Sequence, residues 1–379
     1  MLVLDENRLF GSDAQNLARF KGQILRDRNH PCVFAWSLGN EEWSAQDTAT
    51  GAAVTRAMQD LAHSLDPTRL CTMAVNSGAY GDFGIFSALD VKGFNYHFES
   101  MDAYHAAFPN ADVLGTEQAS TIGTRGIYTN DASRGYVSSY DKNNPSWGQT
   151  AEIWWSYFDA RPWASGGFVW TGFDYRGEPT PYQWPCINSH FGILDTCGFP
   201  KDNFWYYKAW WTTNVVLHLL PHWNWPGREG QNIDVWCYSN CKQVELFLNG
   251  RSLGRQTMAR DSHLSWMVKY EPGVLSAKGY DANGKMITET KVETTGQPAA
   301  IQLTPDRSTI HADGQDLSVV NIAVTDAQGR VVPVATNLIH FIVSGPGKII
   351  GVGNGDPTCH EPDKFVRPSL VHVVAINDC

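Results

Sequence analysis

The chain has 379 residues, a formal net charge of −10, 42% hydrophobic residues and 18% charged residues, which is typical of a globular protein with two or three domains. The acidic balance argues against a nucleic-acid-binding protein, which carries a basic stripe, and no apolar run reaches the roughly 20 residues that cross a bilayer. The eight cysteines include no CxxC pair, so the sequence predicts neither a disulfide scaffold nor a zinc site.

In the first half of the chain, short apolar strands alternate with amphipathic helical patterns. Helices are expected around residues 17–25, 54–65 and 151–158, and strands at residues 2–4, 33–39, 70–75, 91–96, 113–117 and 167–170. Ser12 and Asp13 are N-cap candidates for the first helix. Strands that are buried on both faces and alternate with helices predict a parallel sheet. Six strands are expected where a closed barrel has eight, so residues 1–220 are predicted to form a partial (β/α)8 TIM barrel.

After residue 220 the hydrophobic period changes to two, which predicts antiparallel strands. The dipeptides Asn249-Gly250 and Asn283-Gly284 predict hairpin turns between these strands. The pattern is typical of an Ig-like β-sandwich over residues 221–296. A second Ig-like β-sandwich, truncated at its end, is expected over residues 297–379.

Two glutamates stand at the ends of predicted buried strands, Glu41 after residues 33–39 and Glu117 at the end of residues 113–117. A pair of carboxylates across a barrel mouth can cleave a glycosidic bond, because one protonates the leaving oxygen while the other attacks the anomeric carbon or activates water. Strand-end acids also suit enolases, aldolases and metal sites, so the pattern alone leaves these functions open. Asn40 and Tyr96 lie on the same predicted rim and favour catalysis over solvated loop charges.

The stretch NHPCVFAWSLGNEEW at residues 29–43 resembles the acid/base signature of glycoside hydrolase family 2, the family of β-galactosidases, β-glucuronidases and β-mannosidases. DVLGTEQAS at residues 112–120 is similar to the nucleophile segment of that family. Residues 166–185, 191–211 and 217–230 look like a bacterial β-galactosidase subgroup that has Ig-like domains after the barrel. The resemblance implies a retaining exo-acting enzyme that cleaves terminal β-D-galactosides by double displacement.

Carried over residue by residue, the resemblance makes Glu41 the general acid/base and Glu117 the nucleophile, with the two carboxyl groups about 5–5.5 Å apart. It implies that Asn40 hydrogen-bonds the sugar 2-hydroxyl and that Tyr96 contacts the nucleophile. It also implies that Trp170 forms part of the sugar-binding wall.

Some features depart from the family pattern. Glu42 is a rival for the acid role, and the adjacency of Asn40 to Glu41 decides for Glu41. Ser120 stands where some β-galactosidases carry a histidine. The Asn-x-Lys pattern with which β-glucuronidases bind a carboxylate is not evident after the last barrel strand, which disfavours a glucuronide. A β-mannosidase or β-glucuronidase stays open within the family, and a non-catalytic carbohydrate-binding or adhesion fragment stays open outside it.

The expected partner is a β-galactoside oligosaccharide or glycoconjugate, with no nucleic acid and no membrane span, and homo-oligomerisation is left open. No cofactor is required for this chemistry, although the resemblance allows a Mg or Na ion, and no metal ligand is assigned. The resemblance favours a periplasmic or secreted location. Family members have further N-terminal domains and two earlier barrel strands. The chain is therefore expected to be a fragment that shows at most trace hydrolysis alone, because a misplacement of about 1 Å can cost on the order of 100-fold in rate.

Overall fold

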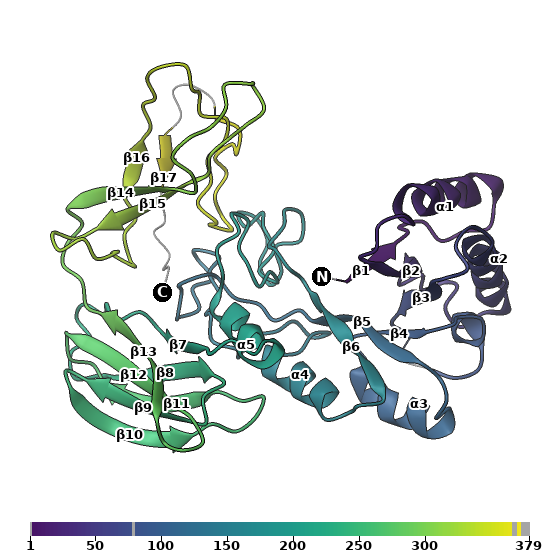
Figure 1. The fold of residues 1–379 in the computed structure, drawn as a ribbon, viewed down its shortest axis with the longest axis horizontal. Coiled ribbons are helices and arrows are strands. Elements are labelled where there is room, and N and C mark those ends of the chain that lie inside the picture. The colour runs from purple at the N-terminus through teal and green to yellow at the C-terminus, as the bar shows by residue number, and fades with distance from the viewer. Residues whose placement is uncertain (1, 78–79, 366–369, 373–379) are drawn as a thin grey trace. The chain divides into compact units, whose positions relative to one another are not determined.

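The computed structural model describes residues 2–77, 80–365 and 370–372 (Figure 1). The chain divides into two units. The first consists of Met1–Ser120, Ser146–Gln149 and Ile153–Trp170, and the second of Thr121–Pro145, Thr150–Glu152 and Thr171–Cys379. Among the described residues, none of the helices has both the length and the apolar character that crossing a bilayer requires.

The first unit is built on one sheet of six parallel strands. The strands are β1 Val3–Glu6, β2 Val33–Asn40, β3 Leu70–Val75, β4 Lys92–Asn95, β5 Val113–Ala119 and β6 Ala164–Trp170. They lie in the order of the sequence, and every neighbouring pair is parallel. The predicted partial (β/α)8 barrel with six strands is therefore confirmed.

The sheet is strongly curved. Phe34 on β2 and Phe168 on β6 stack with their ring centroids 6.2 Å apart. In a flat sheet, four strand spacings of about 4.8 Å would separate these strands by roughly 19 Å. The curvature that brings the two rings together is the curvature of a barrel wall, and it places both rings on its concave face.

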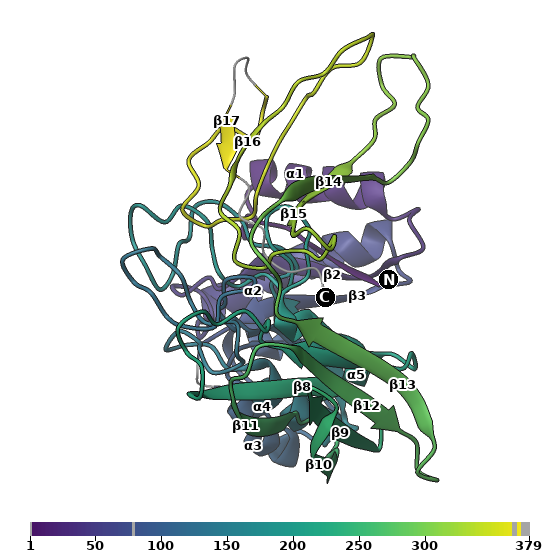
Figure 2. The same ribbon diagram turned by 90° about the vertical axis from the view of Figure 1, so that its left-hand side faces the viewer.

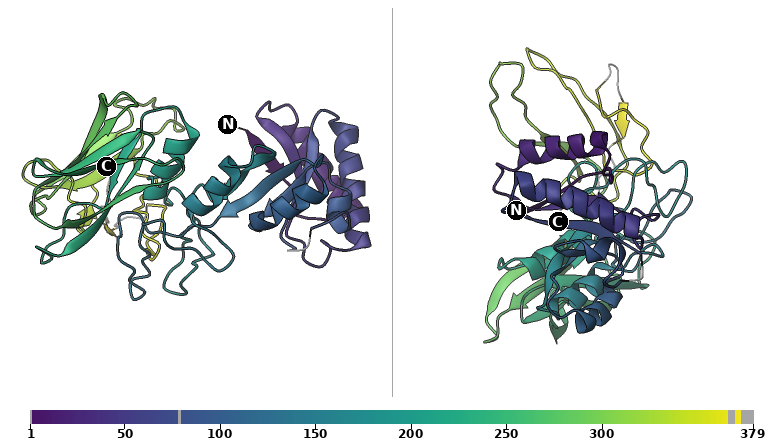
Figure 3. Two further views of the ribbon diagram at one scale, coloured as in Figure 1. Left: turned by 90° about the horizontal axis from the view of Figure 1, so that it is seen from below. Right: turned by 90° about the vertical axis from the view of Figure 1, so that its right-hand side faces the viewer.

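Helices connect the strands of the first unit. They are α1 Ala14–Asp27, α2 Ala49–Leu65, α3 Met101–Ala107 and α4 Ala151–Asp159, with the 3₁₀ turns η1 Gly84–Ser87 and η2 Phe98–Ser100. The carboxylate of Asp13 accepts the backbone N–H groups of Gln15 and Asn16 at 3.0 and 3.1 Å, so the predicted N-cap is confirmed. Phe20 and Ile24 of α1 are fully buried. Helices α1 and α2 lie side by side, as the two purple helices of Figure 3 show.

In the second unit, a β-sandwich follows α5 Asp202–Trp211. Its strands are β7 Leu217–Leu220, β8 Asn232–Ser239, β9 Gln243–Leu248, β10 Arg251–Thr257, β11 Leu264–Lys269, β12 Val274–Tyr280 and β13 Met286–Glu293 (Figures 1 and 2). They form two antiparallel sheets, ordered β10-β9-β12-β13 and β11-β8-β7. The alternating apolar residues enter one core, which includes Val235, Leu246, Leu264 and Leu275.

Two details of this sandwich bear on the sequence prediction. The turn Asn249-Gly250 has φ angles of 51° and 80° and joins β9 to β10, as the hairpin prediction requires. Residues 217–220 were assigned to the barrel, but they form β7 and pair with β8 in the sandwich. An apolar run of four residues fits either domain, and only its long-range pairing decides between them. The boundaries of the three predicted domains stay a prediction.

The remaining strands of the second unit are β14 Ala300–Pro305, β15 Val320–Thr325, β16 Leu338–His340 and β17 Leu370–His372. They pair antiparallel as β14-β15 and β16-β17. A small core of Val324, Val332, Ala335 and Ile339 lies between them. This part is sheet-rich, as predicted. Apart from residues 370–372, the predicted sandwich beyond residue 365 lies outside the described residues.

Candidate active site

The C-terminal ends of β2, β4 and β5 bring the predicted carboxylates to one edge of the sheet. Glu41 follows β2 directly, and its backbone N–H donates to the carbonyl of Ala74 on β3 at 2.9 Å. Glu117 lies in β5 and pairs with Asn95, the last residue of β4. Parallel strands end on the same side, so Glu41 and Glu117 share this edge although 75 residues lie between them in the sequence.

The backbone at this edge adopts a conformation that side chains other than glycine rarely take. Glu41, Tyr96, Ala119 and Ser120 have φ angles of 52°, 61°, 74° and 56°. Each such residue costs about 1–3 kcal/mol and persists only where surrounding contacts hold it. The N–H of Tyr96 donates to the carbonyl of Glu117 at 2.8 Å, and the N–H of Ser120 donates to the carbonyl of Trp170 at 3.1 Å. Strain of this kind concentrates at functional sites, and here it turns the chain sharply at three strand ends.

The side-chain amide of Asn95 is the centre of the site. Asn95 is fully buried, and its Nδ2 lies 2.9 Å from Oε1 of Glu41 and 3.4 Å from Oε2 of Glu117. Nδ2 also lies 3.1 Å from Oδ1 of Asn40. The hydroxyl of Thr116 donates to Oδ1 of Asn95 at 2.7 Å, which fixes the orientation of the amide. Three acceptors share two N–H groups, so the longest contact, to Glu117, is the weakest.

This single nitrogen limits the separation of the two carboxylates. The oxygens of Glu41 and Glu117 that face Asn95 can be no farther apart than the sum of their distances to Nδ2, which is about 6.3 Å. Retaining glycosidases hold their carboxyl groups about 5–5.5 Å apart, and inverting ones about 6.5–9.5 Å apart. For this pair of oxygens, the limit lies below the inverting range.

Tyr96 holds the other oxygen of Glu117. Its hydroxyl donates a short hydrogen bond to Oε1 of Glu117 and lies 2.9 Å from Oγ of Ser120. The one phenolic proton goes to the carboxylate, so the hydroxyl of Ser120 donates to the oxygen of Tyr96. Burial, followed by the adjacent carboxylate of Glu117, raises the pKa of Tyr96 well above its usual range. Tyr96 therefore remains a neutral donor, which favours the ionised form of Glu117.

The two adjacent glutamates point to different partners. The carboxylate of Glu41 accepts from Asn95, whereas the carboxylate of Glu42 lies 3.9 Å from the guanidinium of the exposed Arg8. The left-handed backbone at Glu41 produces this divergence. The geometry thus brings Glu41, and not Glu42, to Glu117.

The five predicted site residues do not all lie in the same network. Asn40, Glu41, Tyr96 and Glu117 are joined by the hydrogen bonds of Asn95 and Tyr96. Trp170 is the last residue of β6, pairs with Ala119 and is half-buried. Its contact with a sugar, like the catalytic roles of the other four, stays a prediction.

Sequence reasoning did not assign a role to Asn95, Thr116 or Ser120. Asn95 is a polar residue at the end of the predicted strand 91–96, and that position is the available signal. Its contacts depend on the spacing of β2, β4 and β5, which no local motif encodes.

The family resemblance allows a Mg or Na ion, and this stays a prediction. Over residues 2–77 and 80–365, three His, Cys, Asp or Glu side chains with donor atoms in reach of one ion occur at His63, Cys71 and Asp90, and not around Glu41.

Comparison with known families agrees with this geometry. The family described as "Glycosyl hydrolases family 2, TIM barrel domain" matches residues 10–213, which is more than half of the chain. The chain belongs to glycoside hydrolase family 2. "Glycoside hydrolase family 2 C-terminal domain 5" matches residues 301–372, and a domain of unknown function (DUF4982) matches residues 230–288.

The chain is similar to several glycoside hydrolases. It is 40% identical to Beta-galactosidase BoGH2A of Bacteroides ovatus over 89% of the chain and 45% of the relative. It is 27% identical to a Beta-glucuronidase of Formosa agariphila over 86% of the chain and 33% of the relative. A crystal structure of a beta-glycosidase from Bacteroides vulgatus superposes with a TM-score of 0.85 at 30% identity, covering 98% of this chain and 52% of that one. The chain thus spans about half the length of these proteins, or less.

Proposed function

We propose that the protein is a retaining exo-glycoside hydrolase that removes terminal β-D-galactosyl residues, with Glu117 as nucleophile and Glu41 as general acid/base. The observation that carries the proposal is the contact of one buried amide nitrogen, Nδ2 of Asn95, with both carboxylates. Such a bridge holds the two carboxyl groups closer together than an inverting mechanism requires, as a double displacement needs.

The first step is glycosylation. A carboxylate oxygen of Glu117 attacks the anomeric carbon while the protonated Glu41 donates its proton to the glycosidic oxygen, so that the aglycone leaves as a neutral alcohol. Oε1 of Glu117 accepts the short hydrogen bond of the Tyr96 hydroxyl, and Oε2 lies 3.4 Å from Nδ2 of Asn95.

The second step is hydrolysis of the glycosyl-enzyme. Glu41, now ionised, takes a proton from water as the water attacks the anomeric carbon and breaks the ester bond to Glu117. Glu41 ends protonated and Glu117 ionised, so the cycle closes with no net change in the protein. The amide of Asn95 can donate to Glu41 in its charged state and thereby stabilise the intermediate before water attacks.

The sequence favours galactose as the sugar. The higher identity is to a beta-galactosidase, and both Asn-x-Lys triplets of the sequence, at residues 240–242 and 283–285, lie in turns of the β-sandwich and not directly after the last barrel strand. The relative named as a beta-glucuronidase keeps β-glucuronides as the alternative substrate, and β-mannosides belong to the same family resemblance.

Hydrolysis of a matched set of nitrophenyl β-glycosides tests the sugar. The sheet has six of the eight strands of a closed barrel. The assay protein should therefore carry these 379 residues joined to two further barrel strands, and we call this protein the completed barrel. We expect kcat/KM for the β-galactoside to exceed that for the β-glucuronide and the β-mannoside by at least about 100-fold, or roughly 2.7 kcal/mol of transition-state discrimination. A preference for the glucuronide would reject galactose but keep the mechanism, whereas sugar binding without turnover of any member would support a non-catalytic binding protein.

A further inference from the structure

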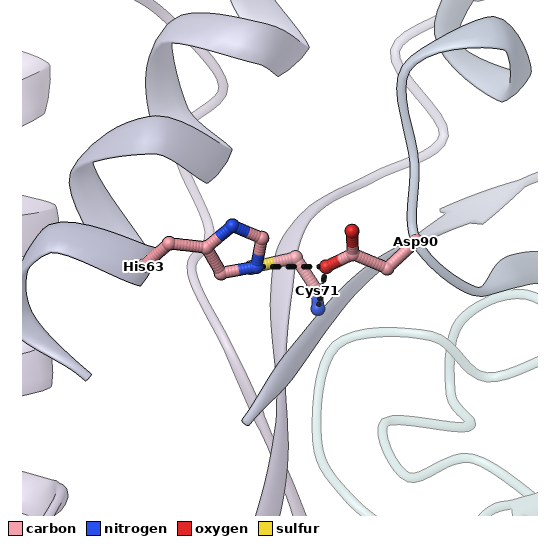
Figure 4. Close-up of side chains that lie close together, drawn as sticks. All are labelled: His63, Cys71 and Asp90. Carbon is pink, nitrogen blue, oxygen red and sulfur yellow. Dashed lines mark hydrogen bonds and ion pairs between the residues drawn. The ribbon is translucent and has the colours of Figure 1, made fainter. Parts of the chain in front are cut away.

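A second group of reactive side chains lies at the opposite end of the strands from the catalytic edge. His63 on α2, Cys71 at the start of β3 and Asp90, two residues before β4, come together in Figure 4. One donor atom from each residue lies within 4.8 Å of the other two, and Nε2 of His63 lies 2.9 Å from Oδ2 of Asp90.

The backbone fixes the positions of Cys71 and Asp90. The N–H of Cys71 donates to Oδ2 of Asp90 at 2.9 Å, and the N–H of Asp90 donates to the side-chain oxygen of Gln59 on α2 at 3.1 Å. The N–H of Val91 donates to the carbonyl of Cys71 at 3.1 Å. A carboxylate and a thiol are therefore held side by side by the β3–β4 pairing, with outer hydrogen bonds of the kind that orient metal ligands.

Two of the three side chains are reachable from solvent. The side chain of His63 is 37% exposed and that of Asp90 is 22% exposed, while Cys71 is fully buried. An ion from solvent would therefore meet the imidazole and the carboxylate first, with the sulfur no more than 4.8 Å from either donor atom.

We propose that His63, Cys71 and Asp90 bind one thiophilic divalent cation, of which Zn²⁺ is representative, with water as the fourth ligand. Bond lengths of about 2.0–2.3 Å in tetrahedral geometry place neighbouring ligand atoms roughly 3.4–3.6 Å apart. The present spacing reaches this with small side-chain rotations. On binding, Cys71 releases its thiol proton to solvent, and neutral His63 carries its proton on Nδ1, so that Nε2 offers a lone pair.

The donor set decides which cation binds. Thiolate and imidazole select Zn²⁺ or Co²⁺ over Mg²⁺ and Ca²⁺, which prefer oxygen ligands. One thiolate and one carboxylate also balance the two positive charges of the ion, so the occupied site is neutral. The bound ion would link α2 to β3 and to the segment before β4, and we expect it to stabilise the first unit.

Titration of the full chain with Co²⁺, in the presence of a reductant that is not a thiol, tests the site. We expect one Co²⁺ per chain with a thiolate-to-cobalt absorption band, competed by Zn²⁺ but not by excess Mg²⁺. The band should disappear in Cys71→Ser, and affinity should fall at least about tenfold in His63→Ala, since one of three ligands is lost. Cys32→Ser, which alters an exposed cysteine, is the matched control and should keep the band.

Three results would overturn the proposal: no thiolate band in the folded wild-type chain, a band that persists in Cys71→Ser, or a band lost in Cys32→Ser. Cys71 is buried, so Cys71→Ser could fail to fold. In that case Zn²⁺ should raise the thermal midpoint of the wild-type chain but not those of His63→Ala and Asp90→Asn. An equal rise in all three proteins would place the ion elsewhere.

Discussion

Replacing Asn95 with aspartate tests the bridge between the two carboxylates. Asparagine and aspartate have the same shape, but the substitution puts an acceptor where Nδ2 now donates to Glu41 at 2.9 Å and to Glu117 at 3.4 Å. A hydrogen bond to a charged group contributes about 1.5–3 kcal/mol, so Asn95→Ala should lower kcat by roughly 10–100-fold. Asn95→Asp adds a negative charge as well, and at about 4 Å this repulsion amounts to about 4 kcal/mol, so the loss should exceed about 1,000-fold.

The assay is the pH dependence of kcat and KM for a nitrophenyl β-galactoside in the completed barrel. The Asn95→Asp protein should regain part of its relative activity as the pH falls, because a protonated carboxyl can donate again. Asn283→Asp adds the same charge in the exposed turn between β12 and β13, and it should leave kcat unchanged. If Asn95→Asp kept kcat within about threefold of wild type, a difference of roughly 0.7 kcal/mol, the amide would be a packing group and the reasoning would be refuted.

Tyr96→Phe removes the donor that stabilises ionised Glu117, so kcat should fall by about 10–100-fold. The acidic limb of the pH profile should also move to higher pH, and a limb that does not move would contradict the assigned hydrogen bond. Glu41→Ala should keep turnover of substrates with good leaving groups and form the β-glycosyl azide when azide is added, whereas Glu42→Ala should resemble wild type; the reverse pattern would exchange the roles of the two residues. Burial raises the pKa of Asp141 from 3.8 to about 6, so the folded chain binds this proton more tightly than the unfolded chain does. The resulting contribution to the free energy of unfolding is fully present below about pH 4 and is lost as the pH rises through about 6. In urea unfolding of the chain, Asp141→Asn should remove about 3 kcal/mol of this pH-dependent change, and an unaltered slope would show that another group causes it.

Much of the first unit could be predicted because its strands are continuous apolar runs. Val33 to Gly39 reads as buried on both faces, and six of the eight residues of β2 are buried. The N-cap at Asp13 depends on that residue's own side chain, and the turn at Asn249-Gly250 depends on the backbone angles that these two residues adopt. A short window of sequence is therefore enough to predict both. The seven-residue helix Met101–Ala107 was missed because it is too short to show a hydrophobic period.

The parts of the site that could not be predicted depend on contacts across strands. Glu41 and Glu117 are visible as acids at strand ends, but the donor that joins them belongs to a third strand. Asn95 reaches both only because β4 pairs with β5 and the sheet curves toward β2. The choice of Glu41 over Glu42 from sequence rested on family resemblance, and its physical basis is the left-handed backbone at Glu41.

The measurement that tests the central claim most directly is capture of the glycosyl-enzyme. The completed barrel would be treated with a 2-deoxy-2-fluoro-β-galactosyl fluoride, which slows hydrolysis of the intermediate more than its formation, and the labelled peptide would be identified by mass spectrometry. The account predicts one fluorogalactosyl group, on Glu117, and a protein that regains activity when the label is hydrolysed. A label on Glu41 or elsewhere, or direct release of the α-anomer from a β-galactoside with no labelled protein, would contradict it.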